Sequence, residues 1–144
     1  MLLAMIVKND SLKINSNKNF EIIDITSQIT EKILIKDGIV NIFSKHSTSA
    51  ILVNENEEGL LRDLELILND MISDNYSYEH DMIDNNAKSH LKSFILSSSE
   101  TIPIKNSKLD LGIWQSVFFV ELDGPRNNRI VDLTFMGEKW KNYF

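Results

Sequence analysis

The sequence predicts a single α+β domain in which antiparallel or mixed β-sheets pack against two to three helices. Its 144 residues are about the length of one domain, so we expect one domain over residues 1–144. No repeat, linker or low-complexity segment divides the chain, and its five Gly and two Pro offer few break points. Strand-like segments are interspersed with segments whose apolar residues recur every three or four positions. Helices set among strands in this way are typical of α+β domains.

The first half of the chain predicts four strands and one short helix. The expected strands are residues 4–14, 20–24, 39–43 and 50–53. Between the second and third of these strands, Ile25, Ile29 and Ile33 share one helical face. Thr26 is a suitable N-terminal cap for this helix, and Gly38 is a suitable stop after it.

The second half predicts two longer helices and three strands. The clearer helix covers residues 57–72, where apolar side chains at helical spacing form one stripe. The stripe consists of Leu60, Leu61, Leu64, Ile67, Leu68, Met71 and Ile72. A second helix is expected over residues 86–97. Its buried residues would be Ala87, Leu91, Phe94 and Ile95. The remaining strands are expected near 100–104, at 116–122 and at 129–135.

Composition excludes several classes of function. The chain has 15 basic and 21 acidic residues, and this net charge of −6 argues against broad nucleic-acid binding, although not against a phosphorylated small ligand. The absence of cysteine excludes disulfides, zinc knuckles and thiol nucleophiles. No apolar stretch approaches the roughly 20 residues that cross a bilayer. The apolar start of the chain reads as a strand and not as a signal peptide. We therefore expect no membrane partner and a cytoplasmic location.

All three histidines, His46, His80 and His90, lie in polar segments of the chain. Neutral imidazole is the commonest metal ligand in proteins and the usual acid or base near pH 7. Because carboxylates such as Asp84 lie nearby in the sequence, the three histidines suggest one assembled metal or acid/base site. Their spacing matches no standard ligand pattern, however.

Hydroxyl and amide side chains surround these histidines. Ser47 and Thr48 follow His46 at the expected end of a strand, where they would either donate to an anion or form an ordinary turn. A Ser-His-acid triad is disfavoured, because no Gly-x-Ser-x-Gly elbow is present. On the expected helix over 86–97, Asn86 and His90 begin a polar stripe that continues through Ser93 and Ser97. This stripe is either a solvated face or the wall of a site.

Two charged residues near the last strands are also candidates. Glu121 shares a strand face with Val117 and Phe119, so its carboxylate needs a partner on a packing face. It is either an edge-strand residue that discourages aggregation or a general acid/base or cation partner. Arg126 ends a tight turn, where it would bind a phosphate or carboxylate or simply be solvated.

Several of these segments together resemble one family. The first is His46-Ser47-Thr48-Ser49-Ala50, with Asn54-Glu55-Asn56 after it. The second is Tyr78-Glu79-His80, followed by Asp84-x-Asn86-Ala87-x-x-His90-Leu91-Lys92. The third is Leu109-x-Leu111-Gly112-x-Trp114-Gln115, followed by Glu121-x-Asp123-Gly124-Pro125-Arg126. In this order over residues 20–137, they resemble the YjbQ-like family of secondary thiamine-phosphate synthases. Ser47, Ser98 and Ile113 depart from the family's usual residues.

The resemblance implies a homotrimer with clefts near its subunit contacts and a weak transferase activity. That reaction joins hydroxymethylpyrimidine pyrophosphate to thiazole phosphate and releases pyrophosphate. A divalent metal, Zn or Mg, would be bound by His46, His80 and His90, or these histidines would shuttle a proton. The alternative is a metal- or ligand-binding trimer without physiological catalysis.

The resemblance also implies roles for the other residues of the site. Asp84 or Glu121 would orient an imidazole and complete the catalytic set. The phosphate- and substrate-binding residues would be Ser47, Thr48, Asn54, Glu55, Asn86, Gln115 and Arg126.

Overall fold

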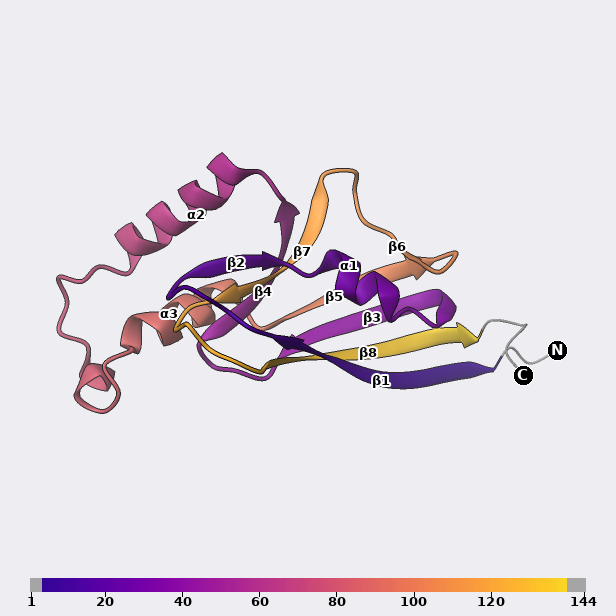
Figure 1. The fold of residues 1–144 in the computed structure, drawn as a ribbon, viewed down its shortest axis with the longest axis horizontal. Helices are drawn as coiled ribbons and strands as arrows, with labels where there is room; N and C mark the ends of the chain where they lie inside the picture. The colour runs from indigo at the N-terminus through magenta and orange to yellow at the C-terminus, as the bar shows by residue number, and fades with distance from the viewer. Residues whose placement is uncertain (1–3, 140–144) are drawn as a thin grey trace.

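The strands form two antiparallel sheets in the computed structural model, which describes residues 4–139 (Figure 1). The larger sheet has the strand order β1-β8-β3-β5-β6 and the smaller sheet the order β2-β7-β4. The strands of the larger sheet are β1 (Met5–Ile14), β8 (Arg129–Lys139), β3 (Ile35–Ser44), β5 (Ser99–Lys105) and β6 (Lys108–Leu109). Those of the smaller sheet are β2 (Glu21–Asp24), β7 (Gln115–Glu121) and β4 (Ser49–Glu55). The predicted α+β class is confirmed.

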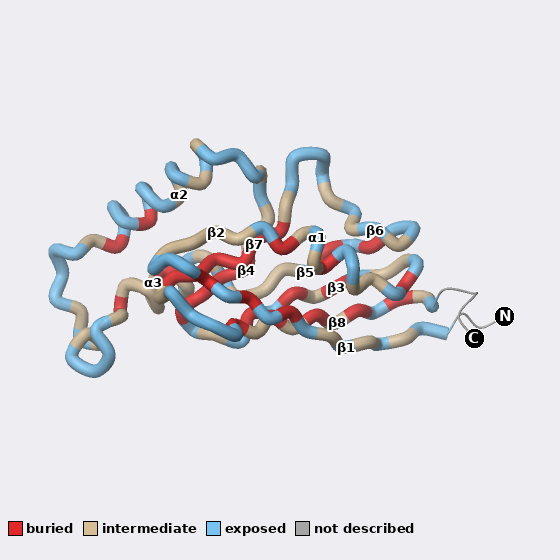
Figure 2. Tube along the Cα trace, viewed as in Figure 1, coloured by how far each residue is buried: buried red, intermediate tan, exposed pale blue. Residues whose placement is uncertain are grey.

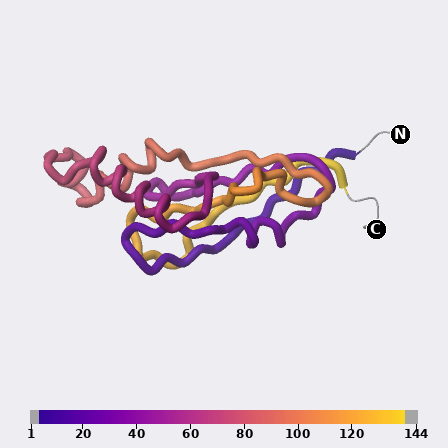
Figure 3. Tube along the Cα trace, turned by 90° about the horizontal axis from the view of Figure 1, so that it is seen from above, coloured from indigo at the N-terminus to yellow at the C-terminus, as the bar shows by residue number. Residues whose placement is uncertain are grey.

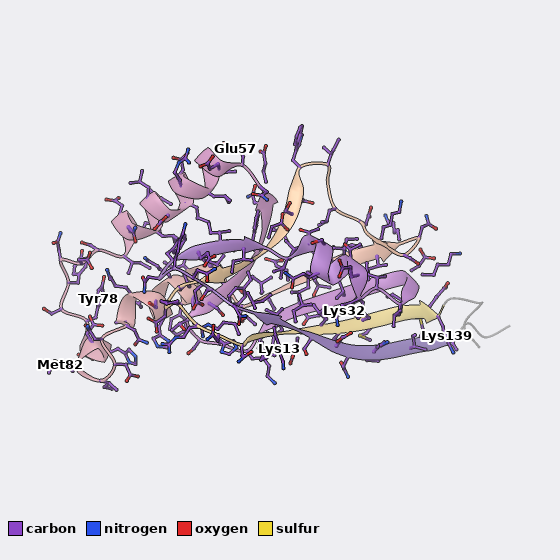
Figure 4. All side chains as sticks on the ribbon, viewed as in Figure 1. Lys13, Lys32, Glu57, Tyr78, Met82 and Lys139 are labelled. Atoms are coloured by element: carbon purple, nitrogen blue, oxygen red, sulfur yellow. The ribbon has the colours of Figure 1, made fainter. Side chains whose placement is uncertain are left out.

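Helices connect the strands and cover part of the smaller sheet. They are α1 (Thr26–Glu31), α2 (Glu58–Met71), the 3₁₀ turn η1 (Glu79–Met82) and α3 (Ala87–Leu96). The side chain of Glu57 accepts hydrogen bonds from two backbone N–H groups of the first turn of α2 and so caps this helix. Figure 4 shows Glu57 at the start of α2, and Tyr78 and Met82 beyond its other end. None of the helices between residues 4 and 139 combines the length and apolar character needed to cross a membrane.

The core lies between the two sheets. The side chains that fill it alternate along the strands, and Val40 and Phe135 of the larger sheet and Phe119 of the smaller one are fully buried there. A smaller apolar cluster around Val120 lies on the other face of the smaller sheet, toward Leu96 of α3. Figures 2 and 3 show that the start of β1 and the end of β8 lie at one narrow end of the molecule and the α2–α3 region at the opposite end.

Two details of the first helix differ from the prediction. Ile25 occupies the capping position and has no side-chain hydrogen bond there, whereas the Thr26 hydroxyl donates to Asp24 at 2.6 Å. Gly38 does not stop the helix but lies inside β3, which begins at residue 35 and has a register shift at this glycine. A Cβ built on Gly38 would lie 2.1 Å from the carbonyl oxygen of Met136, so only glycine fits the close approach of β8.

The apolar stripe of α2 is only partly covered. Leu68 is buried, and Ile72 just beyond the helix is also buried. In contrast, Leu60, Ile67 and Met71 are 41%, 50% and 58% exposed. The helix therefore contacts the smaller sheet loosely, and Figure 2 shows it mostly exposed.

Ser97, just after α3, has a strained backbone. Its φ of 73° and ψ of 159° fall in a region that is essentially restricted to glycine. The segment is fixed on both sides, because Ser97 accepts a hydrogen bond from Ile51 N–H at 3.2 Å and Ser98 accepts one from Ser44 N–H at 2.9 Å. These two bonds to neighbouring strands maintain a conformation that serine alone would avoid.

We predict that Ser97→Gly stabilises the protein by about 1 kcal/mol, because relief of about 1–3 kcal/mol of strain exceeds the entropic cost of glycine. Urea unfolding measures the change. Ser98→Gly is the matched control, since the backbone of Ser98 is not among those with positive φ. It should be destabilised by about 0.5–1 kcal/mol. Equal losses in both variants would show that Ser97 is not strained.

Candidate functional site

A cavity of about 440 Å³ lies between the start of the β3–β4 turn and α3. Its lining residues are Phe43, Ser44, Lys45, His46, Ser47, His90, Ser93, Phe94, Ser97 and Ser98. The strand end positions His46, as the sequence predicted, and the polar stripe of α3 supplies His90 and Ser93. The stripe is thus the wall of a cavity. No carboxylate is among these lining residues.

His46, which lines this cavity, is a neutral ring with one N–H group. Its Nε2 accepts a hydrogen bond from the Ile130 backbone N–H at 2.8 Å, so the proton of the neutral ring is on Nδ1. Burial, and then the positive charges of Arg129 and Lys45, lower the pKa of His46 below its ordinary value. At neutral pH the ring is therefore uncharged and has one N–H to offer.

The serines of the cavity fall into two groups. Ser44 and Ser93 are engaged inside the protein, because Ser44 Oγ is hydrogen-bonded to Ser49 Oγ and Ser93 Oγ donates to the Ser49 carbonyl at 2.6 Å. Within residues 4–139 the hydroxyls of Ser47, Ser97 and Ser98 have no such side-chain hydrogen bond. These three hydroxyls are available to a ligand.

A second cluster adjoins the cavity through His90. The rings of His80 and His90 meet edge to face, with centroids 4.8 Å apart. His80 Nε2 lies 3.1 Å from Asn86 Oδ1, while Asn86 Nδ2 donates to Asp123 at 3.1 Å. Because the amide of Asn86 donates to Asp123, its oxygen faces His80, and His80 Nε2 must carry the proton. Arg126 donates to the same Asp123 carboxylate at 3.0 Å.

Glu121 is the residue whose predicted role changes most. It is fully buried, and Arg129 binds it through Nη2 at 2.8 Å and Nε at 2.9 Å from Oε2. Ser16 Oγ donates to its other oxygen at 3.0 Å, and Thr48 Oγ1 accepts from Arg129 Nη2 at 2.9 Å. The carboxylate is fully engaged by these partners. In this structure Glu121 and Thr48 thus belong to a buried ion-pair network, and the catalytic role predicted for Glu121 and the phosphate-binding role predicted for Thr48 stay predictions.

The predicted metal stays a prediction, because the described residues do not form an assembled set of ligands for it. No group of three or more His, Cys, Asp or Glu side chains within residues 4–139 is placed to bind a metal ion. His46 Nε2 is already taken by the Ile130 N–H, and Asp84 is exposed with no side-chain hydrogen bond to a described residue. The structure therefore gives His46 and Asp84 no metal-binding arrangement.

Asn54, Glu55 and Gln115 lie far from the cavity. They occupy the end of the β4–β7 ladder, where Glu55 pairs with Gln115, whereas Ser49 pairs with Glu121 at the cavity end. Six residues of strand at about 3.3 Å each separate the two ends by about 20 Å. The structure therefore does not bring these three residues to the histidines.

Sequence reasoning missed three residues of this region. Arg129 partners Glu121, Asp123 links Asn86 to Arg126, and Lys45 lines the cavity. A signal existed for Arg129, because a buried carboxylate needs a cation and this residue begins the next strand. Asp123 stood in the segment Glu121-x-Asp123-Gly124-Pro125-Arg126 that resembles the family, but it was given no role, and no sequence pattern pointed to Lys45 in particular.

We predict that Arg129→Met destabilises the protein by about 3–5 kcal/mol, because the substitution leaves the Glu121 carboxylate buried without its partner. Chemical unfolding of a double-mutant cycle with Glu121→Leu measures the coupling. The double variant should recover most of the loss, since it buries no charge. A single-variant loss below about 1 kcal/mol would contradict the buried pair.

We also predict a pH dependence from His46. A histidine with a lowered folded pKa contributes stability that is present above its unfolded value of 6.5 and is lost as the pH falls below it. Urea unfolding measures the difference in free energy of unfolding between the wild type and His46→Gln. This difference should shrink as the pH falls below 6.5, by about 1 kcal/mol for the lost hydrogen bond from the Ile130 N–H. A difference that is constant with pH would refute the assignment.

Comparison with known proteins supports one family. The family described as UPF0047 protein YjbQ-like matches residues 10–138. A UPF0047 protein of Methanothermobacter thermautotrophicus is 50% identical over 129 residues, which is 88% of this chain and 90% of that protein. The UPF0047 protein YugU of Bacillus subtilis is 32% identical over 123 residues, covering 81% of this chain and 90% of that protein.

A solved structure shows the same fold. A YbjQ-like protein of unknown function from Sulfolobus solfataricus superposes with a TM-score of 0.88 at 40% identity. The match covers 94% of this chain and all of that one.

These comparisons overturn the predicted transferase. The relatives are named only as UPF0047 or YjbQ proteins, and the Sulfolobus protein is described as one of unknown function. None of these descriptions mentions thiamine. The prediction of thiamine-phosphate synthase activity is therefore wrong, whereas the resemblance that led to it is confirmed: the chain belongs to the YjbQ-like family of UPF0047 proteins.

Proposed function

We propose that the protein binds a small phosphorylated molecule in the cavity between the β3–β4 turn and α3. The observation that supports this most is the chemistry of the lining, which offers N–H and O–H donors and one lysine but no carboxylate. The chain as a whole has a net charge of −6, so a cavity without a carboxylate is a local departure from its composition. Hydrogen bonds from such donors to an anion are shorter and stronger than neutral ones.

Lys45 supplies the positive charge. Its Nζ lies 3.5 Å from an Asp132 oxygen, and both side chains are more than a third exposed. Exposed ion pairs of this kind contribute at most about 1 kcal/mol. Lys45 can therefore exchange Asp132 for a phosphate at little cost, while the His46 Nδ1–H and the Ser47 hydroxyl approach the same anion.

The cavity also has an apolar side. Phe43 is 42% exposed and Phe94 is 84% exposed, and both line it. A ring or chain attached to the phosphate would cover these two aromatic side chains and remove them from water. The expected ligand is therefore a phosphate monoester with an apolar substituent. The predicted homotrimer and cytoplasmic location stay predictions.

Phenyl phosphate has both groups, and titration calorimetry should show saturable binding with a Kd below about 1 mM. Lys45→Ala and His90→Ala should each weaken the binding of phenyl phosphate about tenfold or more, because a hydrogen bond to a charged group contributes about 1.5–3 kcal/mol. Inorganic phosphate should bind more weakly, since it leaves Phe43 and Phe94 exposed.

Lys36→Ala is the matched control. Lys36 also forms an exposed ion pair, with Asp37 at 4.0 Å, but it does not line the cavity. The affinity of the Lys36→Ala variant for phenyl phosphate should stay at the wild-type value. Equal weakening by Lys36→Ala and Lys45→Ala would mean that only the overall charge matters. No saturable binding to wild type would reject the proposal.

A further inference from the structure

A second cavity, of about 480 Å³, lies beneath α2. Its floor is the outer face of the smaller sheet, with Ile22, Leu52 and Phe118, and its roof is α2. The apolar lining from α2 consists of Leu60, Leu61, Leu64 and Ile67, and Leu96 of α3 also contributes. We call this cavity the α2 groove. It contains Leu60 and Ile67 from the exposed part of the apolar stripe and also Asn54 and Glu55, which the phosphate site does not use.

The walls of the α2 groove are apolar side chains that the fold leaves partly uncovered. Leu60 and Ile67 are 41% and 50% exposed, and Leu61 and Leu64 are half-buried between helix and sheet. The helix does not pack tightly against the sheet here, so the apolar stripe of α2 is not fully buried within the protein. A volume of this size is in the range of small-molecule sites, which are commonly about 300–1,000 Å³.

The charges of the lining indicate which kind of ligand the α2 groove favours. The lining includes two carboxylates, Glu55 and Asp63, and no Lys, Arg or His. Within residues 4–139 neither carboxylate has an ion pair or a side-chain hydrogen bond. An anionic ligand would therefore meet only negative charge, whereas a cation would find two free partners beside an apolar surface. This lining is the electrostatic opposite of the phosphate-binding cavity.

We propose that the α2 groove binds a small apolar molecule that carries a positively charged amine. The apolar part lies between Leu52 and Leu64, and the ammonium group faces Glu55 and Asp63. No covalent chemistry is involved. This site is independent of the phosphate-binding cavity, so either proposal can fail without the other.

Methyl NMR of leucine-labelled protein tests the proposal with 1-naphthylmethylamine as the probe. The expected result is saturable shifts of the Leu52, Leu64 and Leu96 methyl signals. Leu66, which is 70% exposed and lies outside the groove, is the internal control and should not move. The probe 1-naphthylacetate has the same ring with the opposite charge, and it should bind about fivefold or more weakly.

The variant Glu55→Gln/Asp63→Asn tests the charges. It should bind 1-naphthylmethylamine about fivefold more weakly, since two ion pairs are lost. Glu58→Gln/Asp70→Asn makes the same charge change on α2 outside the groove and should bind as wild type does. Unchanged binding by the first variant, or equal weakening by both, would overturn the proposal.

Other occupants give different results. If a second copy of the chain covers the α2 groove, the Leu52 and Leu64 signals will shift with protein concentration and will not respond to the amine. If the groove binds any apolar ring, both naphthyl probes will bind equally. Either outcome would overturn the amine proposal, as would shifts confined to residues outside the groove.

Discussion

The buried contact between Glu121 and Arg129 connects the two sheets at one end of the sandwich. Glu121 ends β7 in the smaller sheet and Arg129 begins β8 in the larger one, and the two side chains are almost completely removed from water. Burying two charges is costly unless every polar atom finds a partner. Ser16 and Thr48 complete that set, so the pair also fixes the loop after β1 and the turn between β3 and β4. The connections β1–β2, β3–β4 and β7–β8 thus meet at one ion pair.

The geometry of the phosphate-binding cavity follows from this contact. Ile130 comes directly after Arg129, and its N–H fixes the ring of His46. The opposite wall, α3, is attached to the smaller sheet by Ser89, which donates to the Leu122 carbonyl at 2.6 Å, and by Ser93. Both walls are therefore positioned by the same strands that hold the ion pair. Donors that are fixed before the ligand arrives lose less entropy on binding, which favours affinity.

Periodicity along the chain predicted the elements, and it placed His46 at a strand end and His90 on a polar wall. Each of these positions depends only on local order, whereas their meeting at one cavity depends on how α3 packs beside the β3–β4 turn. The need of Glu121 for a partner was also foreseeable from its place on a packing face. Its partner was not, because the pairing of Glu121 with Arg129 depends on how two sheets stack. Glu55 follows His46 closely in sequence, but the extended strand β4 carries it about 20 Å from Ser49 at the cavity end.

Helix α3 separates the two proposed sites, and it explains how opposite lining charges coexist in one small chain. His90 and Ser93 face the phosphate-binding cavity, whereas Leu96 faces the α2 groove. Coupling between two sites requires an element with two discrete arrangements. The hydrogen bonds of Ser89 and Ser93 hold α3 against Leu122, just after β7, and Ser49 of β4. Because the shared wall is fixed, a ligand in one site cannot change the shape of the other through α3, and the two ligands should bind independently.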